Sequence, residues 1–177
     1  KSNYKNNFHQ KKESMKRNFF GFDNFETGFI ILSNKDKHPN WTDGSLNSDY
    51  QKTIKRLKKF TGGKIIGSKV LTKYGDIELI KGNVEDTIPN LDKNKIKKIS
   101  VALFDLDLGE PTSICLEFIK DKLTNGSILI FDDYYGFKSS EELGERYAFK
   151  NFCEKNPELK FREYKDYGID GKSFILT

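Results

Sequence analysis

Four carboxylate side chains stand at the ends of two apolar segments of strand length. The first pair is Asp105 and Asp107 in the segment 101–108, and the second is Asp132 and Asp133 in the segment 128–135. The carboxyl ends of parallel strands meet at one edge of a sheet, and ligands bind at that edge. Several carboxylates in a small space repel one another, so we expect a hard divalent cation such as Mg²⁺ between them. The alternative is that these acids cap helix N-termini.

The segment between the two acidic pairs has the spacing of an amphipathic helix. Apolar residues recur at intervals of three and four from Ile114 to Leu123, and Pro111 stands where a first helical turn tolerates proline. We expect Asn125 and Gly126 to end this helix before the second strand begins. The pattern therefore predicts a βαβ unit.

The rest of the chain predicts an α/β fold in a single domain. Strands are expected at 18–23 and 77–81, helices at 48–60 and 140–154, a helical turn at 84–91, and a terminal antiparallel hairpin of 160–164 with 172–176. In the last helix, Leu143, Tyr147 and Phe152 are the expected inward positions. The segment 28–49 has the composition of a long loop, and such loops are often lids.

Composition indicates a globular protein. The chain has 177 residues with 36% hydrophobic and 14% aromatic residues, and no apolar run is long enough to span a bilayer. The net charge of +5 is too small to indicate nucleic-acid binding, so we expect a solvated basic surface, with an anionic partner as the alternative. Cys115 and Cys153 lack a spacing motif, which favours free thiols and a cytoplasmic location. His9 and His38 are the only histidines, which disfavours a zinc site or a Ser/His/Asp triad.

Five segments resemble, in sequence and in order, the macrocin-type sugar O-methyltransferases, which are class I enzymes that use S-adenosylmethionine (SAM). These segments are Phe20–Glu26, Ile80–Pro89, Phe104–Thr112, Ile130–Tyr134 and Gly144–Phe149. The resemblance covers nearly the whole chain from about Asn18 onward. It implies a Rossmann-like, mostly parallel sheet with a C-terminal antiparallel hairpin, and methyl transfer from SAM to a hydroxyl of a sugar or glycosylated metabolite.

Two features depart from the family pattern. Members carry a glycine-rich first strand-to-helix turn, which holds the methionine part of SAM, ahead of the segment matching Phe20–Glu26. The sequence lacks that turn, and Gly62–Gly67 comes too late to replace it, so we expect a domain truncated at its N-terminus. The second departure is Gly109, where members usually carry a large aromatic residue, and we expect a wider pocket there.

The resemblance also implies roles for the acidic residues. Asp105, Asp132 and Asp133 match the metal ligands of the family, and the metal would lower the pKa of the acceptor hydroxyl. Asp105, or alternatively Asp107, would take the proton, with Asp105 slightly favoured. Asp23 would bind the ribose hydroxyls of SAM, unless it only caps a loop.

The remaining candidate residues concern the adenine of SAM, by the same resemblance, and the acceptor, because aromatic rings suit sugar faces. Gly82, Asn83 and Val84 would border the adenine of SAM, although a plain turn would have the same glycine. An acceptor pocket would be lined by aromatic and polar side chains, namely His38, Trp41, Tyr134, Tyr135 and Glu145. For the two residues in the segment 28–49, ordinary loop packing is an equal alternative.

Two other functions compete with methyl transfer. The acidic pairs also resemble those of haloacid-dehalogenase-type phosphohydrolases, but Gly109 stands where that family needs Thr or Val, and the pairs lie too close in sequence. A noncatalytic methyltransferase-like binding or scaffold domain is the other alternative. The acceptor stays open among free sugars, nucleotide sugars, polysaccharides and macrolides, as does assembly into a homo-oligomer.

Overall fold

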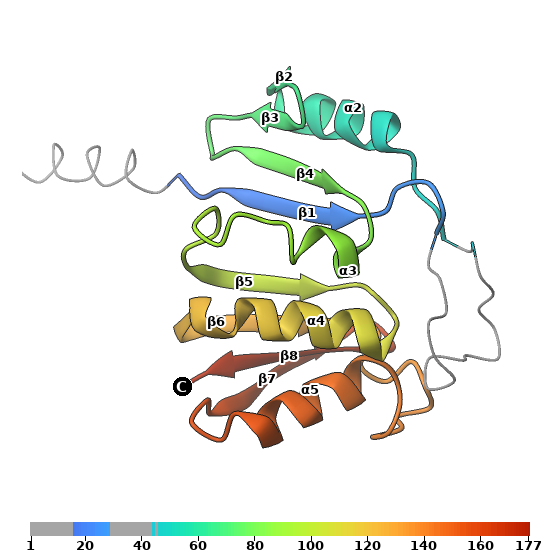
Figure 1. Cartoon of the computed structure of the whole chain (residues 1–177), viewed down its shortest axis with the longest axis vertical. Helices are drawn as coiled ribbons and strands as arrows, with labels where there is room; N and C mark the ends of the chain where they lie inside the picture. The colour runs from blue at the N-terminus through green and yellow to red at the C-terminus, as the bar shows by residue number, and fades with distance from the viewer. Residues whose placement is uncertain (1–15, 29–43, 45) are drawn as a thin grey trace, which may run out of the picture. The chain divides into compact units, whose positions relative to one another are not determined.

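The computed structural model describes residues 16–28, 44 and 46–177, which divide into two compact units (Figure 1). The first unit includes residues 46–83 and the segment up to Gly28, and the second includes residues 84–177. Each unit has its own sheet and its own hydrophobic core. The mixed α/β class is therefore confirmed, while a single domain over residues 1–177 remains a prediction. The expected lid at 28–49 lies largely outside the described residues.

The sheet of the first unit has the strand order β1-β4-β3-β2. Strands β1 (Phe19–Asp23) and β4 (Ile77–Lys81) pair in parallel, and each lies within a segment that was predicted to be a strand. Strands β2 (Lys64–Ile66) and β3 (Lys69–Leu71) form an antiparallel hairpin that the sequence did not predict. They have three residues each, too few for an alternating pattern to be recognised.

Helix α2 (Tyr50–Thr61) begins and ends where local sequence signals place it. The side chain of Asp49 accepts a hydrogen bond from the backbone N–H of Lys52 at 2.7 Å, which caps the N-terminus. Gly62 ends the helix with a φ of 66°, a left-handed conformation that favours glycine. Ile54 is the buried position of the helix and packs in the core of this unit.

The sheet of the second unit has the strand order β5-β6-β8-β7. Strands β5 (Ile99–Phe104) and β6 (Leu123–Phe131) are parallel, and β7 (Phe161–Tyr167) and β8 (Gly171–Leu176) form an antiparallel hairpin beside β6. The predicted βαβ unit and terminal hairpin are confirmed. Among the described strands, only β1–β4 and β5–β6 pair in parallel. The other pairs are antiparallel, so both sheets are mixed.

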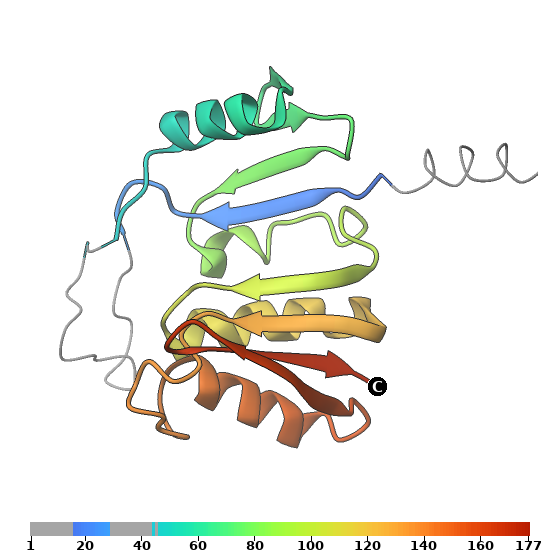
Figure 2. The ribbon, with the colours of Figure 1, turned by 180° about the vertical axis from the view of Figure 1, so that it is seen from behind.

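Two helices cover the same face of this second sheet (Figures 1 and 2). Helix α4 (Gly109–Ile119) connects β5 to β6, and α5 (Gly144–Lys155) precedes the hairpin. A one-turn helix, α3 (Val84–Thr87), precedes β5. Among the described residues, no helix is both long and apolar enough to cross a membrane.

Asn125 and Gly126 do not end the helix as predicted. Helix α4 continues into a 3-10 turn, η2 (Lys120–Lys122), and both residues lie within β6. The register with β5 shifts at this point, and the hydroxyl of Ser127 donates to the carbonyl of Ile99 at 2.7 Å. Gly126, with a φ of 87°, therefore serves a β-bulge, because the left-handed conformation suits bulges as well as helix ends.

Helix α5 begins four residues later than predicted, at Gly144. This glycine has a φ of 63°, and a Cβ atom on it would lie 2.4 Å from the ring of Phe137, so the helix cannot extend regularly toward residue 140. Its fully buried apolar residues are Ala148, Phe149 and Phe152. Of the three predicted inward positions, only Phe152 is among them, and Leu143 and Tyr147 are half-buried.

Aromatic rings at the ends of β5 and β6 form the centre of the second core. The rings of Phe104 and Phe131 stack with their centroids 4.7 Å apart, and Phe149 of α5 lies 4.9 Å from Phe131. Phe131 has no exposed surface. Asp105 and Asp132 directly follow this stacked pair, so the core fixes the strand ends from which the acidic side chains project.

Replacing Phe131 with alanine tests how much this core stabilises the protein. The Phe131→Ala variant should lose about 3–5 kcal/mol of unfolding free energy, because it removes a fully buried ring and leaves a cavity. Urea denaturation followed by circular dichroism measures the loss. Tyr164→Ala is the control, since Tyr164 on β7 is 59% exposed and its removal should cost far less. Equal losses in the two variants would contradict this account of the core.

Candidate functional site

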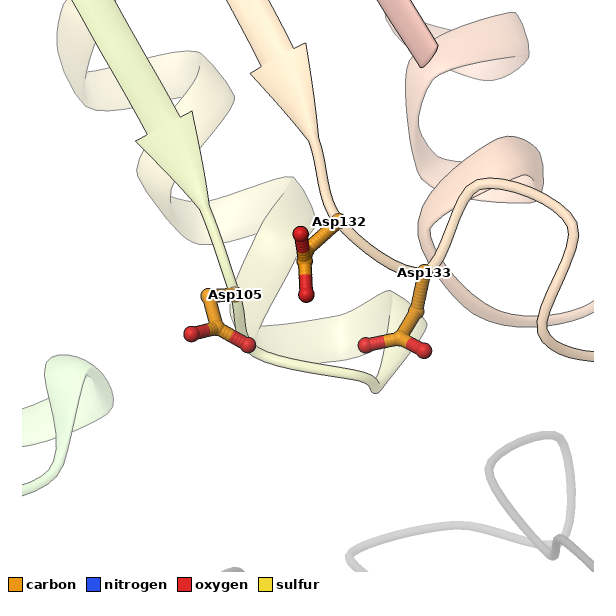
Figure 3. A group of neighbouring side chains, drawn as sticks. All are labelled: Asp105, Asp132 and Asp133. Atoms are coloured by element: carbon orange, nitrogen blue, oxygen red, sulfur yellow. The ribbon is translucent and has the colours of Figure 1, made fainter. Parts of the chain in front are cut away.

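Three aspartates converge at the carboxyl ends of β5 and β6 (Figure 3). Asp105 follows β5, and Asp132 and Asp133 follow β6, and each offers a carboxylate oxygen within 4.8 Å of the others. The backbone N–H of Asp132 donates to the carbonyl of Phe104 at 3.0 Å, which continues the parallel pairing beyond the strands. The expected proximity of these carboxylates is confirmed, because parallel strands of matched register end at the same edge.

A fully buried carboxylate, that of Glu145 in α5, joins the two acidic segments. Its Oε1 accepts the backbone N–H of Leu106, and its Oε2 accepts that of Asp133, both at 3.2 Å. Burial raises the pKa of Glu145 to about 8, although the two N–H groups act in the opposite direction. Both oxygens accept backbone N–H groups and the side chain is buried, so Glu145 supports the two acidic segments, while its predicted contact with an acceptor stays a prediction.

Asp107 occupies an unusual turn beside the three converging aspartates. The backbone N–H of Leu108 donates to the carbonyl of Leu106 at 2.6 Å, which closes a γ-turn around Asp107 with a φ of 61°. The side chain of Asp107 shares a hydrogen bond with Asp133. Burial, this hydrogen bond and the neighbouring negative charges raise the pKa of Asp107 to about 8.

The hairpin of β7 and β8 contributes side chains that sequence reasoning missed. The hydroxyl of Tyr167 donates to Oδ1 of Asp132 at 2.9 Å. Lys172 donates to the hydroxyl of Tyr135 at 3.0 Å and forms an ion pair with Glu163 at 2.9 Å. No local pattern marks Tyr167 or Lys172, because their contacts with Asp132 and Tyr135 join segments that are distant in the sequence.

The predicted acceptor residues are placed in different surroundings. The ring of Tyr134 is half-buried between Phe131 and Phe174, and the guanidinium of Arg146 lies 5.6 Å from its centroid. Burial raises the pKa of Tyr134 above its ordinary value. Its contact with an acceptor stays a prediction. His38 and Trp41 lie outside the described residues.

The predicted cofactor residues of the first unit lie at the carboxyl ends of β1 and β4. Oδ1 of Asp23 accepts the backbone N–H of Phe25 at 2.8 Å, and Oδ2 accepts the hydroxyl of Ser48 at 2.6 Å. The backbone N–H of Gly82 donates to the carbonyl of Asp23 at 3.0 Å, and Gly82 has a φ of 132°. Asp23 therefore does cap its loop, as the alternative proposed, and its contact with ribose stays a prediction.

Asn83 and Val84 follow Gly82 directly in the sequence. Val84 begins α3 in the second unit and is 5% exposed. Its side chain therefore has little surface to offer a ligand. The contact of residues 82–84 with adenine stays a prediction.

Comparison with known proteins connects this chain to methyltransferases. The sequence matches the family model described as macrocin-O-methyltransferase (TylF) over residues 11–156. A search of curated proteins gave no match. The crystal structure of CalS11, a calicheamicin methyltransferase, is 27% identical, with a TM-score of 0.65 over 90% of this chain and 60% of that chain. The chain thus spans about 60% of the length of that relative.

Two further solved structures support the fold alone. The O-methyltransferase NovP is 16% identical, with a TM-score of 0.62 over 88% of this chain and 58% of that chain. An apo structure of CalS11, described as a TDP-rhamnose 3'-O-methyltransferase, is 24% identical, with a TM-score of 0.56 over 90% of this chain and 58% of that chain.

Replacing Glu145 with glutamine tests its support of the acidic segments. An amide keeps the shape of the side chain but turns an NH₂ group toward one of the two backbone N–H groups, which then loses its acceptor. The Glu145→Gln variant should lose about 1–3 kcal/mol of unfolding free energy. Hydrogen exchange at the amides of Leu106 and Asp133 should accelerate.

The matched control is Glu142→Gln, because Glu142 is exposed and lies in the same segment. This variant should change neither stability nor exchange at those amides. If Glu145→Gln behaves like the control, Glu145 does not hold the two segments.

Proposed function

The chain belongs to the macrocin-O-methyltransferase family, and from this premise we propose that the protein transfers a methyl group from SAM to a hydroxyl of a sugar or glycosylated metabolite, assisted by Mg²⁺. The observation that carries the proposal is the convergence of three carboxylates at the strand ends. Similarity to a calicheamicin methyltransferase over 90% of this chain supports the methyl-transfer class. It also supports a Rossmann-like class I domain that includes both units.

The residues at the strand ends fit a hard divalent cation. Asp105, Asp132 and Asp133 supply only carboxylate oxygens, which Mg²⁺ prefers over nitrogen or sulfur. Burial first, and then the hydrogen bond with Asp133 and the negative charge of the neighbouring aspartates, raise the pKa of Asp107. A bound cation would offset that charge and lower the pKa of an acceptor hydroxyl.

Asp107 is the carboxylate that we propose as proton acceptor. Sequence reasoning slightly favoured Asp105, but Asp105 is one of the three converging groups, and Asp107 lies beside them. The hydroxyl O–H bond breaks and its proton passes to the carboxylate of Asp107. The oxygen would then bond to the methyl carbon of bound SAM as the carbon–sulfur bond breaks, which would leave S-adenosylhomocysteine (SAH).

Asp23 is the group that we propose for the ribose of SAM. A carboxylate has about four lone-pair sites, and the N–H of Phe25 and the hydroxyl of Ser48 use one site on each oxygen. Two sites therefore remain for a vicinal diol, and the existing bonds fix the orientation of the carboxylate. Gly82–Val84 would lie near the adenine, where glycine permits close approach of the backbone.

The acceptor and the cellular setting belong to the same proposal. We propose a small-molecule or glycan hydroxyl as acceptor and a cytoplasmic enzyme, with binding of nucleic acid and membrane insertion excluded. Calorimetric titration of SAM and SAH, with and without Mg²⁺, tests the function on this chain and on a form extended at its N-terminus. If neither form binds cofactor or cation, the noncatalytic scaffold replaces the enzyme.

Asp132→Asn tests the cation site. Removing one negative ligand should weaken Mn²⁺ binding at least about tenfold. Electron paramagnetic resonance measures the binding, because it reports the concentration of free Mn²⁺ that remains in solution. Asp132 is exposed, so the melting temperature should change little. Asp121→Asn, an exposed aspartate of η2, is the matched control and should bind Mn²⁺ like the wild type. Unchanged affinity in Asp132→Asn would remove this residue from the ligand set.

Asp23→Asn tests the ribose contact. The amide oxygen can still accept the N–H of Phe25, while the variant loses the charge that a diol would bind. SAH affinity should fall about tenfold or more, because a charged hydrogen bond contributes about 1.5–3 kcal/mol. Calorimetry on whichever form binds SAH measures this, with Asp121→Asn again as the control. A stability loss with unchanged SAH affinity would leave Asp23 with its loop-capping role alone.

A further inference from the structure

We propose that Tyr167 is a positioning residue for Asp132, and that the β7–β8 hairpin thereby sets the geometry of the cation site. The inference rests on the proposed function, since it assigns Asp132 as a ligand. Tyr167 is the last residue of β7, and its hydroxyl lies 2.9 Å from Oδ1 of Asp132. Among the described residues, this hydroxyl is the only hydrogen-bond donor to that carboxylate.

The ring of Tyr167 reaches Asp132 by lying over Gly171, its cross-strand partner in the hairpin. A Cβ atom on Gly171 would lie 2.4 Å from Cζ of that ring and 2.7 Å from Cε1 and Cε2. Such distances are far inside van der Waals contact, so any side chain at this position would displace the ring. Gly171 is therefore required by close approach of the ring, and the hairpin is built to hold the hydroxyl in place.

A second contact ties the same hairpin to the segment that carries Asp132. The backbone N–H of Tyr135 donates to the carbonyl of Asp170, in the hairpin turn, at 2.9 Å. The turn and the acidic segment are thus joined through the backbone as well as through the phenol. The placement of the phenol relative to Asp132 consequently does not depend on the side-chain bond alone.

The hydrogen bond from Tyr167 restricts the side chain of Asp132, which is the proposed cation ligand. Asp132 is exposed, so water would leave its carboxylate free to rotate, and a donor at Oδ1 reduces that freedom. Hydrogen bonds to ligating carboxylates orient them, and loss of such a partner typically lowers metal affinity about 10–100-fold. Tyr167 keeps Asp132 oriented toward Asp105 and Asp133 before any cation arrives.

The test measures Mn²⁺ affinity and melting temperature in four forms of the chain. They are the wild type, Tyr167→Phe, Gly171→Ala and the control Tyr164→Phe. Tyr167→Phe keeps the ring and removes only the hydroxyl, so affinity should fall about tenfold with little change in melting temperature. Gly171→Ala should lower affinity although the hydroxyl remains, because the ring is displaced. Tyr164→Phe removes an exposed hydroxyl of the same strand and should match the wild type.

The outcomes separate this inference from the proposed function. If the wild type binds Mn²⁺ and Tyr167→Phe binds it equally well, the positioning role is wrong while the cation site stands. If the wild type itself fails to bind Mn²⁺, both the proposed cation site and the positioning role of Tyr167 are wrong. A loss of affinity in Tyr167→Phe matched by an equal loss in Tyr164→Phe would also overturn the inference.

Discussion

The acidic edge of the second sheet depends on a carboxylate that has no exposed surface. Glu145 belongs to α5, yet its two oxygens accept backbone N–H groups from the segments that follow β5 and β6. Each N–H belongs to a residue next to, or within, the group of converging aspartates. A buried carboxyl group is stable only when hydrogen bonds compensate its lost hydration, and here the compensating donors are the backbone groups of the two acidic segments. One side chain therefore couples helix packing to the geometry of the site.

The aromatic core supports the same edge from the other side. The stacked rings of Phe104 and Phe131 immediately precede Asp105 and Asp132, and Phe149 packs on them from the helix that carries Glu145. Side chains in a close-packed core have little freedom, so the strand ends cannot drift apart without disturbing many contacts. Negative side chains that repel one another are thus held together by apolar packing and by backbone hydrogen bonds.

The two units share one design principle at their sheet edges. In the first unit, Asp23 is oriented by the N–H of Phe25 and the hydroxyl of Ser48, and in the second, Asp132 is oriented by the hydroxyl of Tyr167. In each case a carboxylate at the carboxyl end of a parallel strand is fixed before a ligand is present. Such preorganisation reduces the entropy lost on binding, and is expected of residues that recognise a ligand.

Local sequence determined the parts of this protein that depend on neighbours in the chain. Apolar runs that end in acids located Asp105, Asp132 and Asp133, and the Asp49 cap with the glycine after Thr61 bounded α2. Local signals failed where one conformation serves two structures. Gly126 has the left-handed backbone of a helix end, but the paired register of β5 and β6 makes it part of a bulge.

Only the tertiary structure decided how the site is held. Glu145 lies 39 residues from Leu106, and Tyr167 lies 35 residues from Asp132, so no periodicity or motif could connect them. From sequence, Glu145 was predicted to line an acceptor pocket, and only the fold shows that it is buried with both oxygens bonded to backbone donors. The physical reason is that side-chain type fixes what a residue can bond, whereas packing of distant segments decides which partner it meets.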